Sequence, residues 1–188
     1  MIYPRCFKGD IRKIYAQGEV FLEVAHDKKH PFIVESDDFK LQVLGTKFNI
    51  SNYKGGTTNI VLVEGAVEVT DKNEKKARLN PNDLLNIANG TIAYQKQVDV
   101  AEYISWVEGI MLLNGNDLSQ IIQRLSIYYG ISIQCDPIIG KEKVYGKLDL
   151  KDDIDEVIEC IQQTLPFTIE KSDTLSLIHI SEPTRRTP

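Results

Sequence analysis

The feature that most constrains the fold is a change in hydrophobic periodicity near residue 99. Before it, apolar residues alternate with polar ones in short runs, as from Val20 to Val24. A period of two is typical of strands that bury one face. After it, two longer segments carry apolar residues at helical spacing. The sequence therefore predicts a β-rich first part and a mixed second part, which makes the chain α+β overall.

Turn-forming residues divide the first part, residues 1–98, at regular intervals. The pair Asn89-Gly90 between two apolar runs is a strong signal for a tight hairpin. The mixed-charge run from Asp71 to Arg78 is interpreted as a solvated turn. Short strands with turns at this spacing predict an all-β sandwich, barrel or solenoid-like domain, and the sequence leaves the three open.

The second part opens with residues 99–109, expected to be a linker or a short helix that carries Trp106 and ends before Gly109. Residues 110–174 then follow the order strand, helix, strand twice in succession. This order predicts a small β-α-β-β-α-β domain, in which each helix covers one face of a small sheet.

Each predicted helix has its own start signal. An apolar stripe runs from Leu118 to Tyr129, with Asn116 or Asp117 placed to cap its first turn and Gly130 placed to end it. A second stripe runs from Ile154 to Leu165, and Asp152 or Asp153 is placed to cap it.

Composition narrows the classes of function. The chain has 22 Lys and Arg against 27 Asp and Glu, a formal net charge of −5, and without a concentrated basic face it is a poor candidate for binding nucleic acid. Its longest apolar stretches fall far below the ~18 residues that cross a bilayer. Three cysteines without C-x-x-C spacing indicate free thiols, although a bridge between Cys135 and Cys160 would suit an oxidising compartment.

The residues do not assemble into a catalytic, cofactor or metal site. His26 and His30 are four apart, but Pro31 follows them and the segment is expected to be a polar turn. Glu19 and Glu23 lie on one side of a strand with backbones ~13 Å apart, too far for a glycosidase pair. Motifs of serine hydrolases, dinucleotide-binding proteins and P-loop proteins are absent from the sequence. We expect no enzymatic activity.

Four motifs in the first part carry a family resemblance. They are GEVFLEV at 18–24, PFIV at 31–34, VLGTKFN at 43–49 and LVEGAVEV at 62–69. In this order they resemble the FecR family of transmembrane anti-sigma regulators, and the turn at 79–83 is similar to the family's Leu-x-Pro-Gly turn, with Asn82 in place of glycine. The motif residues, for which mostly structural roles are expected, are Gly18, Glu19, Phe21, Glu23, Pro31, Phe32, Gly45, Thr46, Phe48, Asn49, Glu64, Gly65, Trp106 and Gly109.

Residues 110–174 are similar to the short N-terminal domains of secretins and TonB-dependent receptors. The resemblance implies a periplasmic sensing region, anchored in the inner membrane of a Gram-negative bacterium, that binds the signalling domain of an outer-membrane transducer and controls an extracytoplasmic-function sigma factor. It implies no cofactor and no metal. Residues 110–170 are the expected docking region. The resemblance also implies that the sigma-binding segment, the membrane helix and the first β strands precede Met1.

The sequence also leaves an alternative function open. A β-rich periplasmic module that binds a ligand or glycan is the alternative function. Such a module requires an exposed aromatic platform, and aromatic residues make up only 8% of the chain.

Residues 175–188 form the last segment, and its first eleven residues resemble a translated sequencing-library adapter. We expect a non-native tail from Leu175, and codons that differ from the adapter throughout would contradict this.

Overall fold

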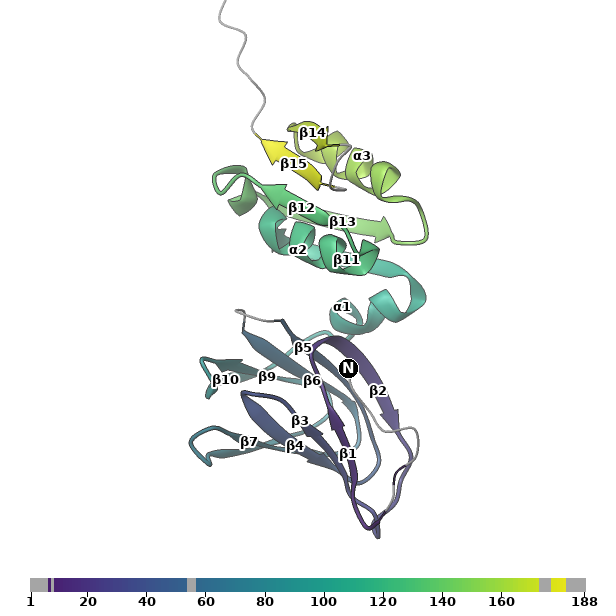
Figure 1. Ribbon diagram of the computed structural model, residues 1–188, viewed down its shortest axis with the longest axis vertical. Helices are drawn as coiled ribbons and strands as arrows, with labels where there is room; N and C mark the ends of the chain where they lie inside the picture. The colour runs from purple at the N-terminus through teal and green to yellow at the C-terminus, as the bar shows by residue number, and fades with distance from the viewer. Residues whose placement is uncertain (1–6, 8, 54–56, 173–176, 182–188) are drawn as a thin grey trace, which may run out of the picture. The chain divides into compact units, whose positions relative to one another are not determined.

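The computed structural model describes residues 7, 9–53, 57–172 and 177–181, and the chain divides into two compact units, Met1–Ile104 and Ser105–Pro188 (Figure 1). The first unit is built of strands and ends in the short helix α1 (Ala101–Ile104). Its strands are β1 (Arg12–Tyr15), β2 (Gly18–Val24), β3 (Phe32–Glu35), β4 (Phe39–Val43), β5 (Thr46–Asn52), β6 (Thr58–Glu64), β7 (Val67–Asp71), β8 (Lys76–Leu79), β9 (Asp83–Ala88) and β10 (Thr91–Gln97).

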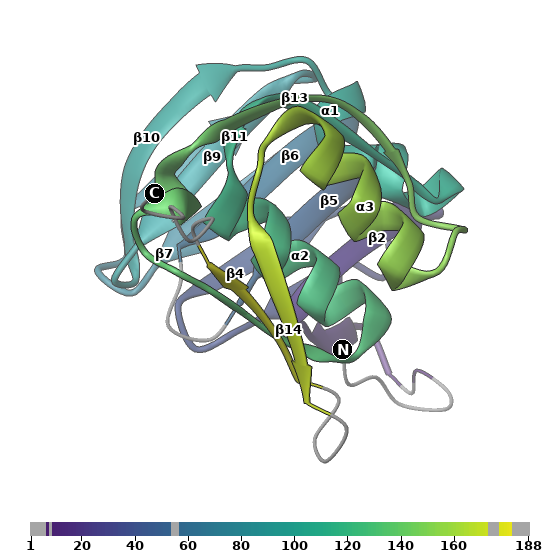
Figure 2. The ribbon, with the colours of Figure 1, turned by 90° about the horizontal axis from the view of Figure 1, so that it is seen from above.

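These strands form two five-stranded sheets that face each other across one core. The first sheet has the order β1-β3-β4-β7-β8, and the second has the order β10-β9-β6-β5-β2, visible face-on in Figure 2. Alternate residues of both sheets point inward, among them Leu41 and Val69 from the first sheet and Phe48, Ile60 and Leu85 from the second, all 0% exposed. Of the three architectures that the sequence left open, the first unit adopts the sandwich.

The predicted hairpin at Asn89-Gly90 is confirmed. Strands β9 and β10 pair antiparallel with Ala88 opposite Thr91, and the two turn residues have φ of 52° and 74°. Asparagine and glycine tolerate this left-handed conformation better than other residues, which is why the pair marks such a turn.

The solvated turn predicted from Asp71 to Arg78 is wrong at its first residue. Lys72 to Lys76 are exposed, but Asp71 is only 4% exposed. Its carboxylate accepts the backbone N–H groups of Asn73 (2.8 Å) and Lys75 (2.9 Å) in its own turn, and that of Ile92 (3.0 Å) in the other sheet. The charge pattern marked an exposed turn, whereas this aspartate is a buried tie between the two sheets.

The second unit contains the 3-10 turn η1 (Ser105–Glu108), β11 (Ile110–Asp117), α2 (Leu118–Tyr129), β12 (Ser132–Cys135), a second 3-10 turn η2 (Ile139–Lys141), β13 (Lys143–Asp149), α3 (Ile154–Thr164), β14 (Thr168–Ser172) and β15 (Leu177–Ser181). Both helices and the strands that flank them occur where the periodicity places them. The segment 99–109, expected to be a linker or a short helix, contains the short helix α1 followed by the 3-10 turn η1.

Strand pairing in the second unit does not stay within the two consecutive strand-helix-strand segments. Strand β11 pairs antiparallel with β13 in a two-stranded sheet, and β12 and β14 lie on either side of β15 in a three-stranded sheet. The two strands that flank each helix therefore belong to different sheets. Strand β15 pairs with both β12 and β14. Both helices contribute to a single core, with Leu118, Leu125 and Ile158 nearly fully buried.

The predicted helix ends are confirmed for α3 and for the end of α2, but the start of α2 lacks the predicted side-chain cap. Asp153 caps α3, and its carboxylate accepts the N–H groups of Asp155 and Glu156, both at 3.0 Å. Asp117 holds the cap position of α2, but its side chain makes no capping hydrogen bond and instead pairs with Lys143 at 2.9 Å. Gly130 ends α2 with φ of 68°, as predicted.

The buried carboxylate of Asp71 predicts a dependence of stability on pH. The N–H of Ile92, followed by those of Lys75 and Asn73, holds the pKa of this carboxyl below its usual value. The ionised group therefore stabilises the fold above the unfolded-chain pKa of about 3.9, and this stabilisation is lost as pH falls through the lower folded-state pKa. We expect Asp71→Asn to lower the urea midpoint at pH 7, and the deficit to shrink below about pH 4. Exposed Asp152→Asn is the control, and a deficit independent of pH would contradict the assignment.

Tyr129 gives a second stability prediction. Its hydroxyl lies 3.0 Å from the carbonyl oxygen of Leu150 and 2.9 Å from that of Asp152, and its one proton is shared between these two acceptors. Burial raises the pKa of Tyr129 to about 12, so the phenol remains a donor at neutral pH. Tyr129→Phe should destabilise the second unit by about 1–2 kcal/mol in urea unfolding, because the carbonyl of buried Leu150 loses its donor. The neighbouring Tyr128→Phe, whose ring is 44% exposed, is the matched control and should change stability much less.

Candidate functional site

Two of the motif glycines, Gly45 and Gly65, lie close together at one end of the sandwich, where the chain crosses between the sheets. Gly45 lies in the turn from β4 to β5 and Gly65 in the turn from β6 to β7. A Cβ on Gly65 would lie 2.7 Å from the carbonyl oxygen of Gly45, and a Cβ on Gly45 would lie 2.6 Å from Cα of His26. The Thr46 hydroxyl donates to the carbonyl of Ala66 at 3.1 Å. The motif around Gly45 and the motif around Gly65 therefore form a close contact between two turns.

A groove of about 690 Å³ opens beside these turns. Apolar side chains from the turns and neighbouring strands line it, together with His26, Glu68 and Arg78. Arg78 lies 3.5 Å from the Glu68 carboxylate, so opposite charges already face each other in the groove. An exposed pair of this kind contributes little binding energy of its own.

Glu19 and Asn49, from two separate motifs, form one polar network. Asn49 is 1% exposed and its amide donates to Glu19 Oε1 at 3.2 Å, while the Tyr53 hydroxyl donates to Glu19 Oε2 at 2.9 Å. The strands that carry them, β2 and β5, are neighbours with Phe21 opposite Asn49. The network gives the Glu19 carboxylate and the Asn49 amide a structural role, since each satisfies the other.

The other motif residues stabilise the sandwich of the first unit or lie at the start of the second unit. Glu23 and Glu64 flank Lys47 at 3.8 and 3.7 Å. Gly18 begins β2 with φ of 85°. Phe48 is fully buried, and Phe32 lies beneath the Arg12 guanidinium, 5.5 Å from its ring centroid.

Three remaining motif residues lie at turns. The carbonyl of Pro31 accepts from the Arg12 N–H at 3.0 Å. Trp106 packs against the core of the second unit. Gly109 ends η1 with φ of 79°, and its carbonyl accepts from Leu150 N–H at 2.7 Å. Asn82, which departs from the family's glycine, adopts φ of 71°, a conformation that asparagine tolerates.

The turn at residues 26–30 is polar, as predicted. The Asp27 carboxylate accepts the N–H groups of Lys29 and His30 and lies 2.7 Å from His30 Nδ1. These contacts, the His30 side chain first, hold the pKa of Asp27 below its usual value. Within the described part of the chain, no three side chains of the metal-binding types gather in one place.

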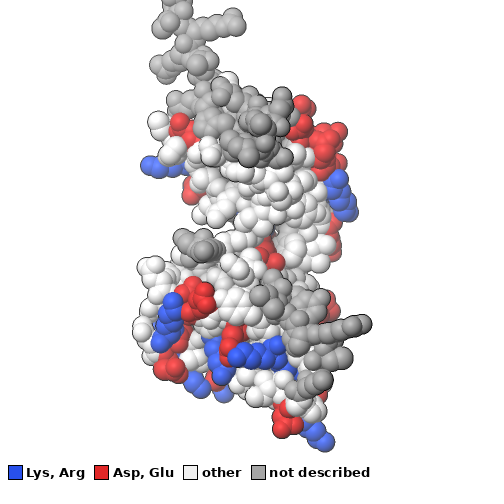
Figure 3. All heavy atoms as spheres, viewed as in Figure 1, with Lys and Arg blue, Asp and Glu red and all other residues white. Residues whose placement is uncertain are grey.

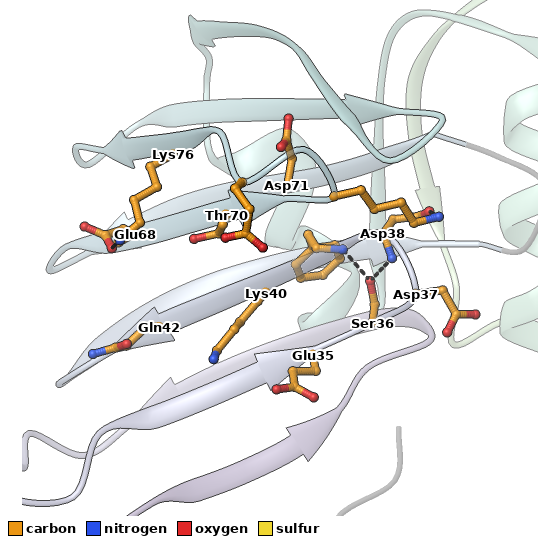
Figure 4. A pocket seen from close by; sticks show the side chains of 13 residues that line it. Glu35, Ser36, Asp37, Asp38, Lys40, Gln42, Glu68, Thr70, Asp71 and Lys76 are labelled. Carbon is orange, nitrogen blue, oxygen red and sulfur yellow. Dashed lines mark hydrogen bonds and ion pairs between the residues drawn. The ribbon is translucent and has the colours of Figure 1, made fainter.

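A second groove, of about 400 Å³, lies on the outer face of the first sheet (Figure 4). Charged residues line it and pair with one another: Lys72 lies 2.8 Å from Asp38, and Lys76 lies 2.9 Å from Glu68. Figure 3 shows Lys and Arg interspersed with Asp and Glu over this unit. Its aromatic lining residue, Phe39, is 4% exposed. This groove therefore lacks the exposed ring that the glycan-binding alternative requires.

The exposed apolar side chains of the second unit were missed by the sequence interpretation. Ile138 and Tyr145 are each 66% exposed, and Ile127 and Tyr128 at the end of α2 are 45% and 44% exposed. Tyr145 lies on β13 between buried Val144 and exposed Gly146. The strand pattern places it on the solvent side, and an aromatic residue at such a position is the signal that was available. It lies in the expected docking region, residues 110–170.

The contact between the two turns predicts a specific loss of stability. Gly65 has φ of 96° as well as the close approach to Gly45, so Gly65→Ala should cost about 1–3 kcal/mol in urea unfolding. Gly18→Ala is the matched control, since Gly18 has φ of 85° but no atom within 4 Å of an added Cβ. Equal losses for both variants would show that backbone strain alone is responsible and that the contact contributes nothing.

Comparison with known proteins assigns the chain to a family. The model described as FecR protein matches residues 7–68, and the model described as FecR, C-terminal matches residues 110–178. No curated protein matches the chain.

Two crystal structures of a protein assigned as an anti-sigma factor from Parabacteroides distasonis ATCC 8503 resemble the whole chain. The structure at 1.65 Å has a TM-score of 0.81 and 29% identity, and covers 97% of this chain and 86% of its own. The structure at 2.50 Å has a TM-score of 0.80 and 30% identity, and covers 97% of this chain and 85% of its own. With both family models in order and this likeness across its length, the chain belongs to the FecR family of anti-sigma factors, which are regulatory proteins.

Proposed function

We propose that this chain is the periplasmic sensing region of an anti-sigma regulator and that its second unit binds the signalling domain of an outer-membrane TonB-dependent transducer. Members of the family are membrane-anchored anti-sigma factors with periplasmic regions. The described residues include no helix long and apolar enough to span a bilayer. The proposal includes control of an extracytoplasmic-function sigma factor by the regulator.

The observation that carries the proposal is the surface of the second unit. Tyr145 projects from a two-stranded sheet in which, among the described strands, β11 and β13 pair only with each other. Each strand therefore has an edge at which a partner strand can add, and strand addition beside exposed apolar side chains is a common mode of recognition between small domains. Tyrosine is also among the residues that contribute most to binding energy at interfaces.

The two grooves of the first unit support a scaffolding role for it. Charged side chains pair across both of them, Arg78 with Glu68 in one and Lys72 with Asp38 in the other. Motif residues of the first unit, among them Glu19, Thr46 and Asn49, are engaged in contacts within it. We therefore assign no catalytic or cofactor-binding function to the first unit, and the proposed signal passes by protein contact.

Binding of the intact chain to a transducer signalling domain from the same genome tests the proposal. Tyr145→Asp should raise the Kd at least tenfold in biolayer interferometry, because it places a charge where an aromatic anchor is buried. Tyr94→Asp is the matched control, since Tyr94 lies on β10 of the first unit and is 48% exposed, and it should bind like the unmodified chain. Equal loss in both variants, or loss only in Tyr94→Asp, would refute docking through the second unit.

A further inference from the structure

The phenol of Tyr145 lies against a glycine of the neighbouring strand. Strands β11 and β13 pair in a two-stranded sheet (Figure 1), and the register places Asn114 opposite Tyr145. The Oη, Cζ and Cε1 atoms of Tyr145 lie 3.0, 3.2 and 3.3 Å from the position that a Cβ on Gly115 would occupy. The ring therefore reaches past its cross-strand partner, and the missing side chain at Gly115 leaves the room that the phenol needs.

Gly115 is also the extra residue of a β-bulge in β11. The register shifts between Asn114, opposite Tyr145, and Asn116, opposite Val144. Gly115 has φ of 75°, and the Asn116 side chain accepts the Asn114 N–H at 2.8 Å, which stabilises the bulge. Bulges twist a strand locally and redirect side chains, and they are frequent beside functional sites. Gly115 thus sets the shape of β11 where the phenol of Tyr145 lies.

The contact with Gly115 leaves most of Tyr145 available to a partner. On the opposite face of β13, Val144 and Leu148 are buried in the core of the second unit, whereas Tyr145 is 66% exposed. An aromatic ring over a glycine of the next strand stabilises a sheet through the surface that it covers. Since most of the surface of Tyr145 is uncovered, the contact orients the ring more than it buries it.

We propose that Gly115 is a positioning residue for partner binding, which holds Tyr145 across the β11–β13 sheet in the orientation that the transducer's signalling domain binds. This inference rests on the docking function proposed above and adds the residue that prepares its anchor. A side chain that is already immobilised loses less conformational freedom on binding, so a fixed ring raises affinity without a new contact. The exposed ring fits an apolar recess on the partner.

The contact itself is tested in the intact chain without a transducer. In NMR spectra, the ring protons of Tyr145 should show nuclear Overhauser contacts with the Hα protons of Gly115, and Tyr145→Ala should shift the Gly115 Hα resonances because it removes the ring. Absence of these contacts would overturn the positioning role, whether or not the chain binds a transducer.

Affinity for a signalling domain from the same genome is then measured by biolayer interferometry. Gly115→Ala should raise the Kd at least fivefold, because the added Cβ displaces the phenol. Gly115→Asn adds the same Cβ in a residue that tolerates positive φ, and it should raise the Kd likewise. Gly130→Ala is the matched control, since Gly130 lies in the same unit with φ of 68° and no atom within 4 Å of an added Cβ. It should change the Kd less than twofold.

A double-mutant cycle separates positioning from a general loss of structure. In a Tyr145→Ala background, Gly115→Ala should change the Kd less than twofold, since no ring is left to displace. An equal loss of affinity with and without the tyrosine would assign the effect of Gly115 to the fold. Equal Kd values for Gly115→Ala and Gly130→Ala would show that orientation of the ring contributes nothing. Either result overturns the proposal, whereas an unmodified chain that does not bind would refute the docking function and the positioning role with it.

Discussion

The close approach of two turns at one end of the sandwich is the constraint on which the first unit depends. At Gly45 the chain leaves the first sheet for the second, and at Gly65 it returns. Both crossings occur side by side, with 2.7 Å between the Gly45 oxygen and the place of a Cβ on Gly65. Larger residues would push the crossings apart and change the spacing of the two sheets, whose side chains fill the core between them. The Thr46 hydroxyl and the Ala66 carbonyl fix the same contact by a hydrogen bond.

Much of this architecture could be predicted because the strands, helices and tight turns depend on residues that are close together in the sequence. Strand period, helical stripes and the Asn89-Gly90 turn depend on neighbouring residues, and the structure has these elements where the patterns place them. Pairing between distant strands has no such local signal. Nothing near Ile110 indicates that β11 pairs with β13 rather than with the strand after its helix. For the same reason Asp71 was misread, since its partner Ile92 lies in another sheet.

In the candidate site, too, some residues could be predicted from the sequence and others could not. The motif glycines and the Glu19 to Asn49 pairing explain residues that the family resemblance had identified, and their roles are structural, as expected. The exposed apolar residues were not identified. Tyr145 lies on the face of β13 opposite buried Val144, and a search of the sequence for the buried face passes over side chains on the exposed one. Surface residues are recognised by their departure from the pattern, which requires the strand and its register to be known first.

The paired crossings also bear on the order in which the first unit assembles. Strands β4 and β7 are neighbours in the first sheet, although β5 and β6 lie between them in the chain. Those two intervening strands form an antiparallel hairpin in the second sheet. Once that hairpin has formed, the ends of the loop between β4 and β7 are already close together. Pairing β4 with β7 then costs little further loop-closure entropy. The β5-β6 hairpin therefore lowers the entropic cost of pairing β4 with β7, although these two strands are distant in the chain.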